Sequence, residues 1–300
     1  SGTQLVVTSS TYISGIESIS SGLFFTREKE FTTGSELMKI DITTNAVTNV
    51  KDFGYFYYIS DISKVDNNTL VFMATDDTDL NKYKLYSSDG TAIGTTPIAF
   101  IYSGSGVSQQ TVMTQVGNQV YFFYKENGID CCNHLYVTDG TAIGTTKLKE
   151  FNIVFVYDYE QRRKAADFNS KFYFMAVDNG GNPNNDKVLW VSDGTTLGTN
   201  PLHLPADYYN PRYLTSFNSK LYFVAYNLDT YNYQLYSTDG TTLGTTAVST
   251  KYDGSTIYPY EIISDGSFIY MAADNYLPVS YTHLRAHETK ANLVCRLLLE

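Results

Sequence analysis

The sequence predicts an all-β fold, a partial β-propeller of about six four-stranded antiparallel blades. Three observations predict it. An Asp-Gly-Thr motif recurs along the chain, an aromatic run rich in β-formers recurs in register with it, and helical periodicity of useful length is absent. Four short strands in every 46–54 residues is the organisation of a propeller blade.

The first motif reads Leu, Tyr or Trp, any residue, Ser or Thr, then Asp-Gly-Thr and a later Gly-Thr. Four copies align without gaps, and their Asp residues are 50, 54 and 46 residues apart, at Asp89, Asp139, Asp193 and Asp239. A degenerate copy at Leu37–Asp41 lies 48 residues before Asp89. Gly2–Val6 matches the end of a further copy. We therefore expect the chain to begin inside a repeat.

The second signature is a run of apolar and aromatic residues such as Leu221–Ala225. Six copies occur within the first 278 residues, centred on Phe25, Phe72, Phe122, Phe174, Phe223 and Tyr270. The run is too short and too rich in β-formers for a helix, so it predicts a strand. Because it is apolar almost without alternation, we expect both faces of each small sheet to be buried against neighbouring blades.

Each repeat is predicted to contain four strands, which we name A to D. Strand A precedes a polar turn, as Tyr213–Phe217 precedes Asn218-Ser219, and strand B is the aromatic run. Strand C carries the Leu-Tyr or Leu-Trp pair, and the Asp-Gly-Thr turn leads into strand D. Strand D is predicted to end near Ile98, Leu148, Leu202 and Val248.

The Asp-Gly-Thr turn is interpreted as scaffold rather than as a set of acid or metal sites. An Asp at a hairpin corner accepts hydrogen bonds from backbone amides two residues further on, and the Gly adopts a positive φ. One turn per blade is also dispersed around a ring, so the four carboxylates cannot converge on one substrate. The predicted structural residues are Asp89, Gly90, Asp139, Gly140, Asp193, Gly194, Asp239 and Gly240.

The motif resembles that of the ELWxxDGT repeat family, and the resemblance covers residues 1–278. Only Leu189-Trp190 keeps the Trp, while Tyr86, Tyr136 and Tyr236 replace it elsewhere, and the Glu occurs only as Glu36. These departures are conservative for packing. The resemblance implies a secreted or surface-exposed bacterial repeat protein that is propeller-like and has no established enzymatic role. It supplies no catalytic residue and no cofactor.

The last residues, 279–300, are predicted not to belong to the repeat domain. Val279–Thr289 resembles the translated read-through of a transposase sequencing adaptor, and Leu293–Leu299 resembles the outer segment of the same adaptor. Two matches in the correct order indicate a non-native continuation of a metagenomic gene fragment. The segment contains His283 and His287, so we build no metal or catalytic site on that pair.

Charge and hydropathy argue against nucleic-acid binding and against a membrane-spanning helix. The formal net charge of −10 argues against nucleic-acid binding, which needs basic patches. No run of 18 apolar residues is present, so we expect no membrane-spanning helix. Three cysteines do not make a disulfide scaffold, and the sequence leaves the oligomeric state and the blade number of the ring open.

A binding function is predicted for the face of the blades where the loops differ. In a propeller the B–C loops and D–A junctions emerge on one face, the loop face, and the A–B and C–D turns on the other, the turn face. Tyrosines gather at the D–A junctions, and we predict binding through Tyr57, Tyr159, Tyr208, Tyr209 and Tyr258. Rings stack on sugars while amides and carboxylates bind hydroxyls, so the predicted ligand is a carbohydrate or a protein.

Three alternatives stay open at this point. The B–C loop at Asp178, Asn182 and Asp186 has an oxygen-rich composition that suits calcium, although it lacks an EF-hand pattern. A glycoside-active enzyme could use charged residues of strand A at the channel, namely Glu160, Arg162, Arg163, Arg212 and Glu261. The domain could also be a purely structural spacer. His134 and His203 are interpreted as structural.

Overall fold

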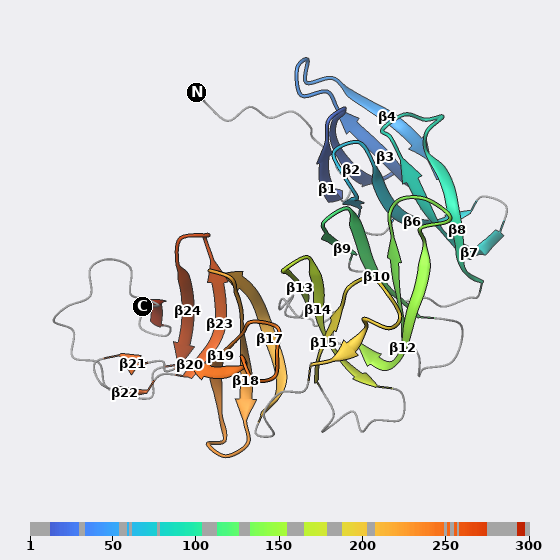
Figure 1. Ribbon diagram of the computed structural model, residues 1–300. Helices are drawn as coiled ribbons and strands as arrows, with labels where there is room; N and C mark the ends of the chain where they lie inside the picture. Colours follow the sequence, from blue (N-terminus) through green and yellow to red (C-terminus); the bar gives the residue numbers. More distant parts are fainter. Residues whose placement is uncertain are drawn as a thin grey trace. The chain divides into compact units, whose positions relative to one another are not determined.

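A computed structural model shows the fold of the chain (Figure 1). The structure describes residues 13–29, 34–53, 59, 62–76, 79–103, 113–125, 133–154, 165–178, 188–202, 208–248, 251–252, 255–256, 258–274 and 293–297. All regular elements in these ranges are β-strands. The same ranges hold no helix long and apolar enough to cross a membrane. The chain forms two compact units, Ser1–Phe151 and Asn152–Glu300.

The first unit holds repeats 1 to 3, and within each repeat consecutive strands pair antiparallel in chain order (Figure 1). Repeat 1 contains β1 (Ile13–Ile19), β2 (Gly22–Glu28), β3 (Ser35–Ile40) and β4 (Val47–Asp52). Repeat 2 contains β5 (Ser63–Lys64), β6 (Leu70–Asp76), β7 (Asp79–Ser88) and β8 (Thr96–Ser103). Repeat 3 contains β9 (Met113–Val116), β10 (Gln119–Lys125), β11 (Asn133–Thr138) and β12 (Thr146–Val154), the last of which runs across the unit boundary.

The second unit holds repeats 4 to 6. Repeat 4 contains β13 (Ala165–Phe168), β14 (Lys171–Asp178), β15 (Val188–Ser192) and β16 (Asn200–Pro201). Repeat 5 contains β17 (Tyr208–Phe217), β18 (Lys220–Asn227), β19 (Asn232–Thr238) and β20 (Thr246–Val248), and a small pair follows it, β21 (Lys251–Tyr252) and β22 (Ser255–Thr256). Repeat 6 contains β23 (Tyr258–Ser264), β24 (Ile269–Asp274) and β25 (Leu293–Leu297). The A-to-D strand order predicted for each repeat is confirmed in repeats 1 to 5, whereas the described part of repeat 6 contains only β23, β24 and β25.

A stack of two rings forms the centre of repeats 2 to 5. The middle Phe of strand B pairs across the sheet with the Tyr or Trp of strand C, and all of these rings are buried except that of Tyr136, which is partly buried. The pairs, with ring-centroid distances, are Phe72–Tyr86 at 5.6 Å, Phe122–Tyr136 at 5.4 Å, Phe174–Trp190 at 6.4 Å and Phe223–Tyr236 at 5.7 Å. The aromatic position of the motif therefore closes the core of its own sheet.

The remaining core lies between consecutive repeats. Within the first unit, one apolar cluster joins repeats 1 and 2 around Phe24 and Phe53, and a second joins repeats 2 and 3 around Met73 and Tyr124. Within the second unit, one cluster joins repeats 4 and 5, and another joins repeats 5 and 6. Within each unit, consecutive sheets thus bury the faces that they turn toward one another, which explains why strand B lacks polar alternation.

Three boundaries differ from the sequence prediction. Strand A of repeat 5 begins at Tyr208 instead of Tyr213, because Tyr208 and Tyr209 pair with Asn227 and Tyr226 of β18. The loop predicted over residues 76–81 is wrong: Asp76 pairs with Asp79, so only residues 77–78 separate β6 from β7. Strand D is longer in β8 and β12 than the motif indicates.

The predicted non-native tail contains β25, which pairs antiparallel with β24 in the place of strand C. An apolar segment of any origin can pair with an open sheet edge through its backbone. The structure therefore does not test the origin of residues 279–300. The assignment of residues 1–278 to one repeat domain also stays a prediction.

Candidate functional site

The Asp-Gly-Thr turn has the same hydrogen bonds in repeats 2 to 5. In repeat 2, Oδ1 of Asp89 accepts bonds from the amide and hydroxyl of Thr91, at 2.8 and 2.7 Å. The Thr91 hydroxyl accepts a bond from the Gly94 amide, and the Thr95 hydroxyl donates to the Thr91 carbonyl oxygen. The equivalent bonds recur around Asp139, Asp193 and Asp239. These carboxylates are thus engaged inside their own turns.

The later Gly of the motif is required by the carboxylate itself. A Cβ added at Gly94 would fall on the carboxylate of Asp89, and the same holds for Gly144, Gly198 and Gly244 in the other copies. The hydrogen bonds from the Thr91 hydroxyl and amide hold the pKa of Asp89 below its usual range. The pKa values of Asp193 and Asp239 are lowered in the same way by Thr195 and Thr241.

The first Gly of the motif lets the turn approach the preceding repeat. Gly90 has a φ of 87°, and a Cβ there would lie 2.5 Å from Cζ of Phe24 and 2.7 Å from the Ser21 hydroxyl. A Cβ at Gly140 would meet Thr69 at 2.9 Å, and one at Gly240 would meet the Tyr173 hydroxyl at 2.6 Å. The Ser21 hydroxyl also donates to the Asp89 carbonyl oxygen at 3.3 Å. The turn face is therefore tightly packed from one repeat to the next.

Hydrogen bonds also join the A–B turn regions of consecutive repeats. The Ser20 amide donates to the Asn67 carbonyl oxygen at 2.6 Å, and the Gln115 side chain donates to the Val65 carbonyl oxygen at 3.1 Å. In the second unit, the Ser216 hydroxyl donates to the Asp167 carbonyl oxygen. Within each unit, consecutive repeats therefore place their A–B and C–D turns at one end of the sheets.

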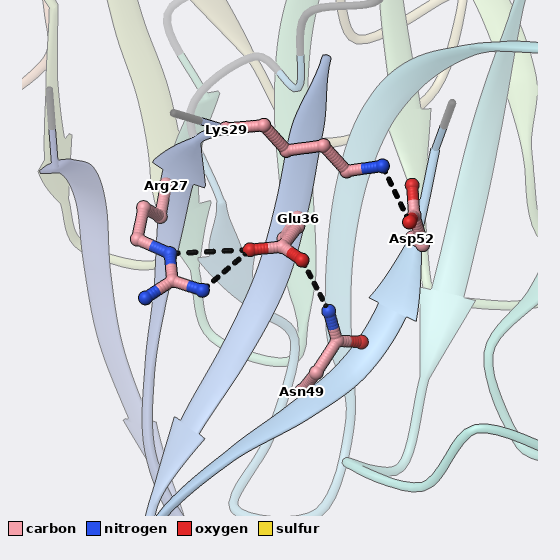
Figure 2. Close-up of polar contacts among 5 residues, drawn as sticks. All are labelled: Arg27, Lys29, Glu36, Asn49 and Asp52. Atoms are coloured by element: carbon pink, nitrogen blue, oxygen red, sulfur yellow. Dashed lines mark hydrogen bonds and ion pairs between the residues drawn. The ribbon is translucent and has the colours of Figure 1, made fainter. Parts of the chain in front are cut away.

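At the loop end of repeat 1, a polar ladder crosses three strands (Figure 2). One oxygen of Glu36 accepts two bonds from Arg27, at 2.6 and 3.1 Å, and the other accepts a bond from Asn49 at 2.8 Å. Lys29 and Asp52 form an ion pair beside them. Glu36 is 14% exposed, and its carboxylate joins β2, β3 and β4 through these neighbours. The single Glu of the motif thus supports the sheet.

At the loop end of repeat 5, aromatic and amide side chains gather around a B–C hairpin. Oδ1 of Asn227 caps the turn by accepting bonds from the amides of Asp229 and Thr230, at 2.9 and 2.8 Å. Its side-chain amide donates to the Tyr236 hydroxyl at 3.0 Å. At the tip of the hairpin, Tyr231 is 75% exposed and Leu228 is 45% exposed. A rigid turn thus presents an aromatic ring and an aliphatic side chain to solvent.

Beneath this hairpin lies a stack built on Arg212. The Arg212 guanidinium lies 3.8 Å from the ring centroid of Tyr233, whose ring meets that of Tyr226 edge-on at 5.3 Å. A register shift lies on each side of Arg212 in strand A, and the backbone has positive φ values of 61° at Asn210 and 58° at Tyr213. Left-handed backbone is strained for an aromatic residue, and strain of this kind gathers at functional sites. In repeat 1, Gly15 takes the same place with a φ of 58°.

The predicted binding tyrosines are only partly covered by the structure. Tyr57 and Tyr159 lie outside the described residues. Tyr208 and Tyr209 begin β17 and Tyr258 begins β23, where the backbone alone is described. The sequence placed these three at D–A junctions, and in the structure they belong to strand A, because each pairs with the end of strand B. Their role in binding stays a prediction. The backbone register places Tyr208 and Tyr209 beside the repeat-5 hairpin.

The residues of the alternative hypotheses lie as follows. Asn182 and Asp186 of the calcium loop fall outside the described residues, and Asp178 ends β14 with only its backbone described. The part of the chain that the structure describes holds no group of three or more metal-ligating side chains. Glu160, Arg162, Arg163 and His203 also lie outside it. Arg212 is buried in its stack and Glu261 is exposed on β23, whereas His134 is buried with Nδ1 3.8 Å from Glu150.

The sequence did not lead us to predict that Tyr231 and Leu228 are exposed at the tip of this hairpin. It also did not lead us to predict that Arg212 packs on Tyr233. A usable signal was present, because Asn227-Leu-Asp-Thr has the Asx-turn pattern that fixes a short hairpin. Once the turn is fixed, the number of residues in the hairpin determines which side chain is exposed, here the ring of Tyr231.

The fold is similar to that of solved β-propellers. The β-propeller domain of the Trilobed protease from Pyrococcus furiosus matches with a TM-score of 0.51 and 10% identity, over 88% of this chain and 78% of that chain. A prolyl endopeptidase matches with a TM-score of 0.58 and 12% identity, over 91% of this chain. The chain spans only 39% of that endopeptidase. At these identities the likeness shows the fold alone, and the β-propeller prediction is confirmed.

No protein-family model and no curated protein matches the chain in sequence. The resemblance to the ELWxxDGT family, with the bacterial secreted or surface location that it implies, therefore stays a prediction.

Proposed function

We propose that this β-propeller is a non-catalytic module that binds carbohydrate through its loop face. The observation that carries the proposal is the repeat-5 hairpin, where a capped turn exposes Tyr231 and Leu228 above the Arg212–Tyr233 stack. An exposed ring on a rigid turn can stack on the apolar face of a sugar with little loss of side-chain freedom. Amides such as Asn232 beside it can bind hydroxyl groups.

The register of strand A adds to this support. Tyr208 and Tyr209 lie opposite Asn227 and Tyr226 in the strand register. This end of repeat 5 therefore contains five aromatic residues, namely Tyr208, Tyr209, Tyr226, Tyr231 and Tyr233. A protein ligand would use the same rings, but amide-rich and weakly charged surroundings suit hydroxyl groups better. The proposal includes the secreted or surface location, which fits a glycan ligand.

The enzyme alternative has less support in the second unit. Arg212 is 7% exposed, and its guanidinium packs on the Tyr233 ring, so we assign this side chain to the packing of repeat 5. We therefore expect any activity on glycosides to survive the double substitution Arg212→Ala and Glu261→Ala. A loss of activity with retained folding would favour the enzyme alternative. The likeness to a prolyl endopeptidase, which shows the fold alone, does not enter the proposal.

A glycan array probed with the chain tests the proposal. We expect binding to at least one glycan class, and a loss of about tenfold or more in affinity for Tyr231→Ala, since one stacked ring contributes on the order of 1.5 kcal/mol. Tyr208→Ala and Tyr209→Ala extend the test to strand A. Thr242→Ala, exposed on the opposite face, is the matched control and should bind as the parent does. Equal binding by all loop-face variants would disprove this site.

A further inference from the structure

One large aliphatic residue stands at the tip of every complete C–D turn. Ile93, Ile143, Leu197 and Leu243 occupy the same place, four residues after the Asp, and are 93, 95, 92 and 96% exposed. In the shorter turn of repeat 1, Ile42 is also exposed. These five account for half of the ten exposed large hydrophobic residues in the described ranges. Single exposed aliphatic residues are ordinary, but the same position in all of repeats 2 to 5 is not scatter.

The turns hold these side chains rigidly away from the core. The Asp and Thr bonds fix the backbone on one side of each tip, and the carboxylate packed against the later Gly fixes it on the other. The tip residue cannot fold back without breaking that network. Its burial therefore requires something outside its own turn. We call the four residues Ile93, Ile143, Leu197 and Leu243 the pegs.

Within each unit, the pegs point from the same end of the sheets. The turn carrying Ile93 rests on Phe24 and Ser21 of repeat 1, and the turn of Ile143 rests on the A–B turn of repeat 2. In the second unit, the turn carrying Leu243 rests on Tyr173 of repeat 4. Tyr173 lies near the start of β14 and pairs with Val191 of β15, just before the turn that carries Leu197. Each unit therefore displays at least two pegs in one direction.

The residues around each peg indicate which kind of partner can cover it. Segments 90–96, 140–146, 194–200 and 240–246 contain no charged residue. Each peg is more than nine-tenths exposed, so it stands alone and does not line a groove. A protein partner would need one matching pocket for each peg, whereas a fluid lipid layer accepts separate apolar side chains without such pockets.

The charges select the kind of lipid. One Asp lies at the base of every peg, and hydrogen bonds keep the pKa values of Asp89, Asp193 and Asp239 low, so these groups are anionic at neutral pH. Choline and ethanolamine headgroups offer ammonium groups to such carboxylates at the layer surface. An anionic lipid would instead be repelled by a chain of net charge −10.

We propose that the turn end of each unit is a lipid-contact surface. In the first unit Ile93 and Ile143, and in the second unit Leu197 and Leu243, enter the outer part of a zwitterionic phospholipid layer, and the Asp at the base of each turn stays among the ammonium headgroups. Contact is shallow and reversible, because single aliphatic side chains bury little area. It is separate from glycan binding at the loop face.

Flotation of the full chain with phosphatidylcholine vesicles tests this proposal. We compare the parent, the peg variant Ile93→Thr with Ile143→Thr, and the matched variant Ile16→Thr with Ile263→Thr. The matched variant removes two exposed isoleucines that lie outside the C–D turns. Circular dichroism checks that all three fold. A second set of vesicles contains half phosphatidylglycerol.

We expect the parent and the matched variant to float with phosphatidylcholine, and the peg variant to bind about tenfold more weakly. Binding should fall when phosphatidylglycerol is added. Absence of flotation by the parent, or equal flotation by the peg variant, would overturn the proposal. Tighter binding to anionic vesicles would also overturn it. Self-association that the peg substitutions abolish, without flotation, would assign the pegs to a second copy of the chain instead.

Discussion

The two ends of the repeats are built on different principles. At the turn end, the same short bonds recur around Asp89, Asp139, Asp193 and Asp239. At the loop end, repeat 1 carries an ionic ladder around Glu36, whereas repeat 5 carries an arginine–tyrosine stack. Local sequence determines the first, and cross-strand partners determine the second. A motif that repeats in sequence therefore marks what holds the blades together, and the variable end is free to differ.

The largest expected effect is at the inter-repeat contact of the turn end. Gly90→Ala introduces a left-handed alanine and a clash with buried Phe24, so we expect about 3 kcal/mol of destabilisation. Gly266 has nearly the same φ, 88° against 87°, and no atom within 4 Å of an added Cβ. Gly266→Ala should therefore lose only about 1 kcal/mol. Equal urea midpoints for the two variants would show that the contact between this turn and the preceding repeat does not contribute to stability.

The next effect is on the carboxylate inside the turn. Asp193→Ala removes the acceptor of two bonds from Thr195, and we expect a loss of about 1.5 kcal/mol in unfolding free energy. Asp229→Ala in the same unit removes an exposed carboxylate at the loop end and should leave stability unchanged. Chemical denaturation of both variants measures the difference. If Asp229→Ala lowers the unfolding free energy by the same amount, the change in net charge, and not the lost hydrogen bonds of the turn, explains the effect.

A smaller effect is expected for the ladder of repeat 1. Glu36→Ala leaves Arg27 and Asn49 without their shared acceptor, with a loss of about 1 kcal/mol. Asp52 is 51% exposed, and its pair with Lys29 is screened by water, so Asp52→Ala should lose about 0.5 kcal/mol or less. Glu36→Gln should recover part of the loss through the Asn49 bond. The order of the three thermal midpoints checks this account.

The smallest effect is a pH dependence of stability from the turns. The pKa values of Asp89, Asp193 and Asp239 are lower in the folded chain than their ordinary value of 3.8. Their contribution is therefore complete above about pH 4 and is lost as the pH falls through the lowered values. The triple variant with Asn at these positions should lose less stability than the parent between pH 5 and 3, approximately. Parallel pH profiles would assign the acid sensitivity elsewhere.

The sequence predicted the parts of the fold that local residues determine. The motif gave the C–D turns, and the aromatic runs gave strand B, because turn chemistry and β-forming residues act over a few positions. The start of β17 at Tyr208 was not predictable, since it depends on pairing with Asn227 of another strand. The register shifts around Arg212 were missed for the same reason. The close approach of Gly90 to Phe24 depends on how two repeats pack.

Repeat 5 offers the most direct test of the division between the two ends, because Asp239 and Tyr231 lie at opposite ends of the same sheet. Unfolding free energy and glycan affinity are measured for the parent, Asp239→Ala and Tyr231→Ala. The account predicts that Tyr231→Ala retains the stability of the parent and loses glycan binding. It predicts that Asp239→Ala loses stability and, below its unfolding transition, binds as the parent does. Undiminished binding by Tyr231→Ala, or a loss of binding by folded Asp239→Ala, would contradict it.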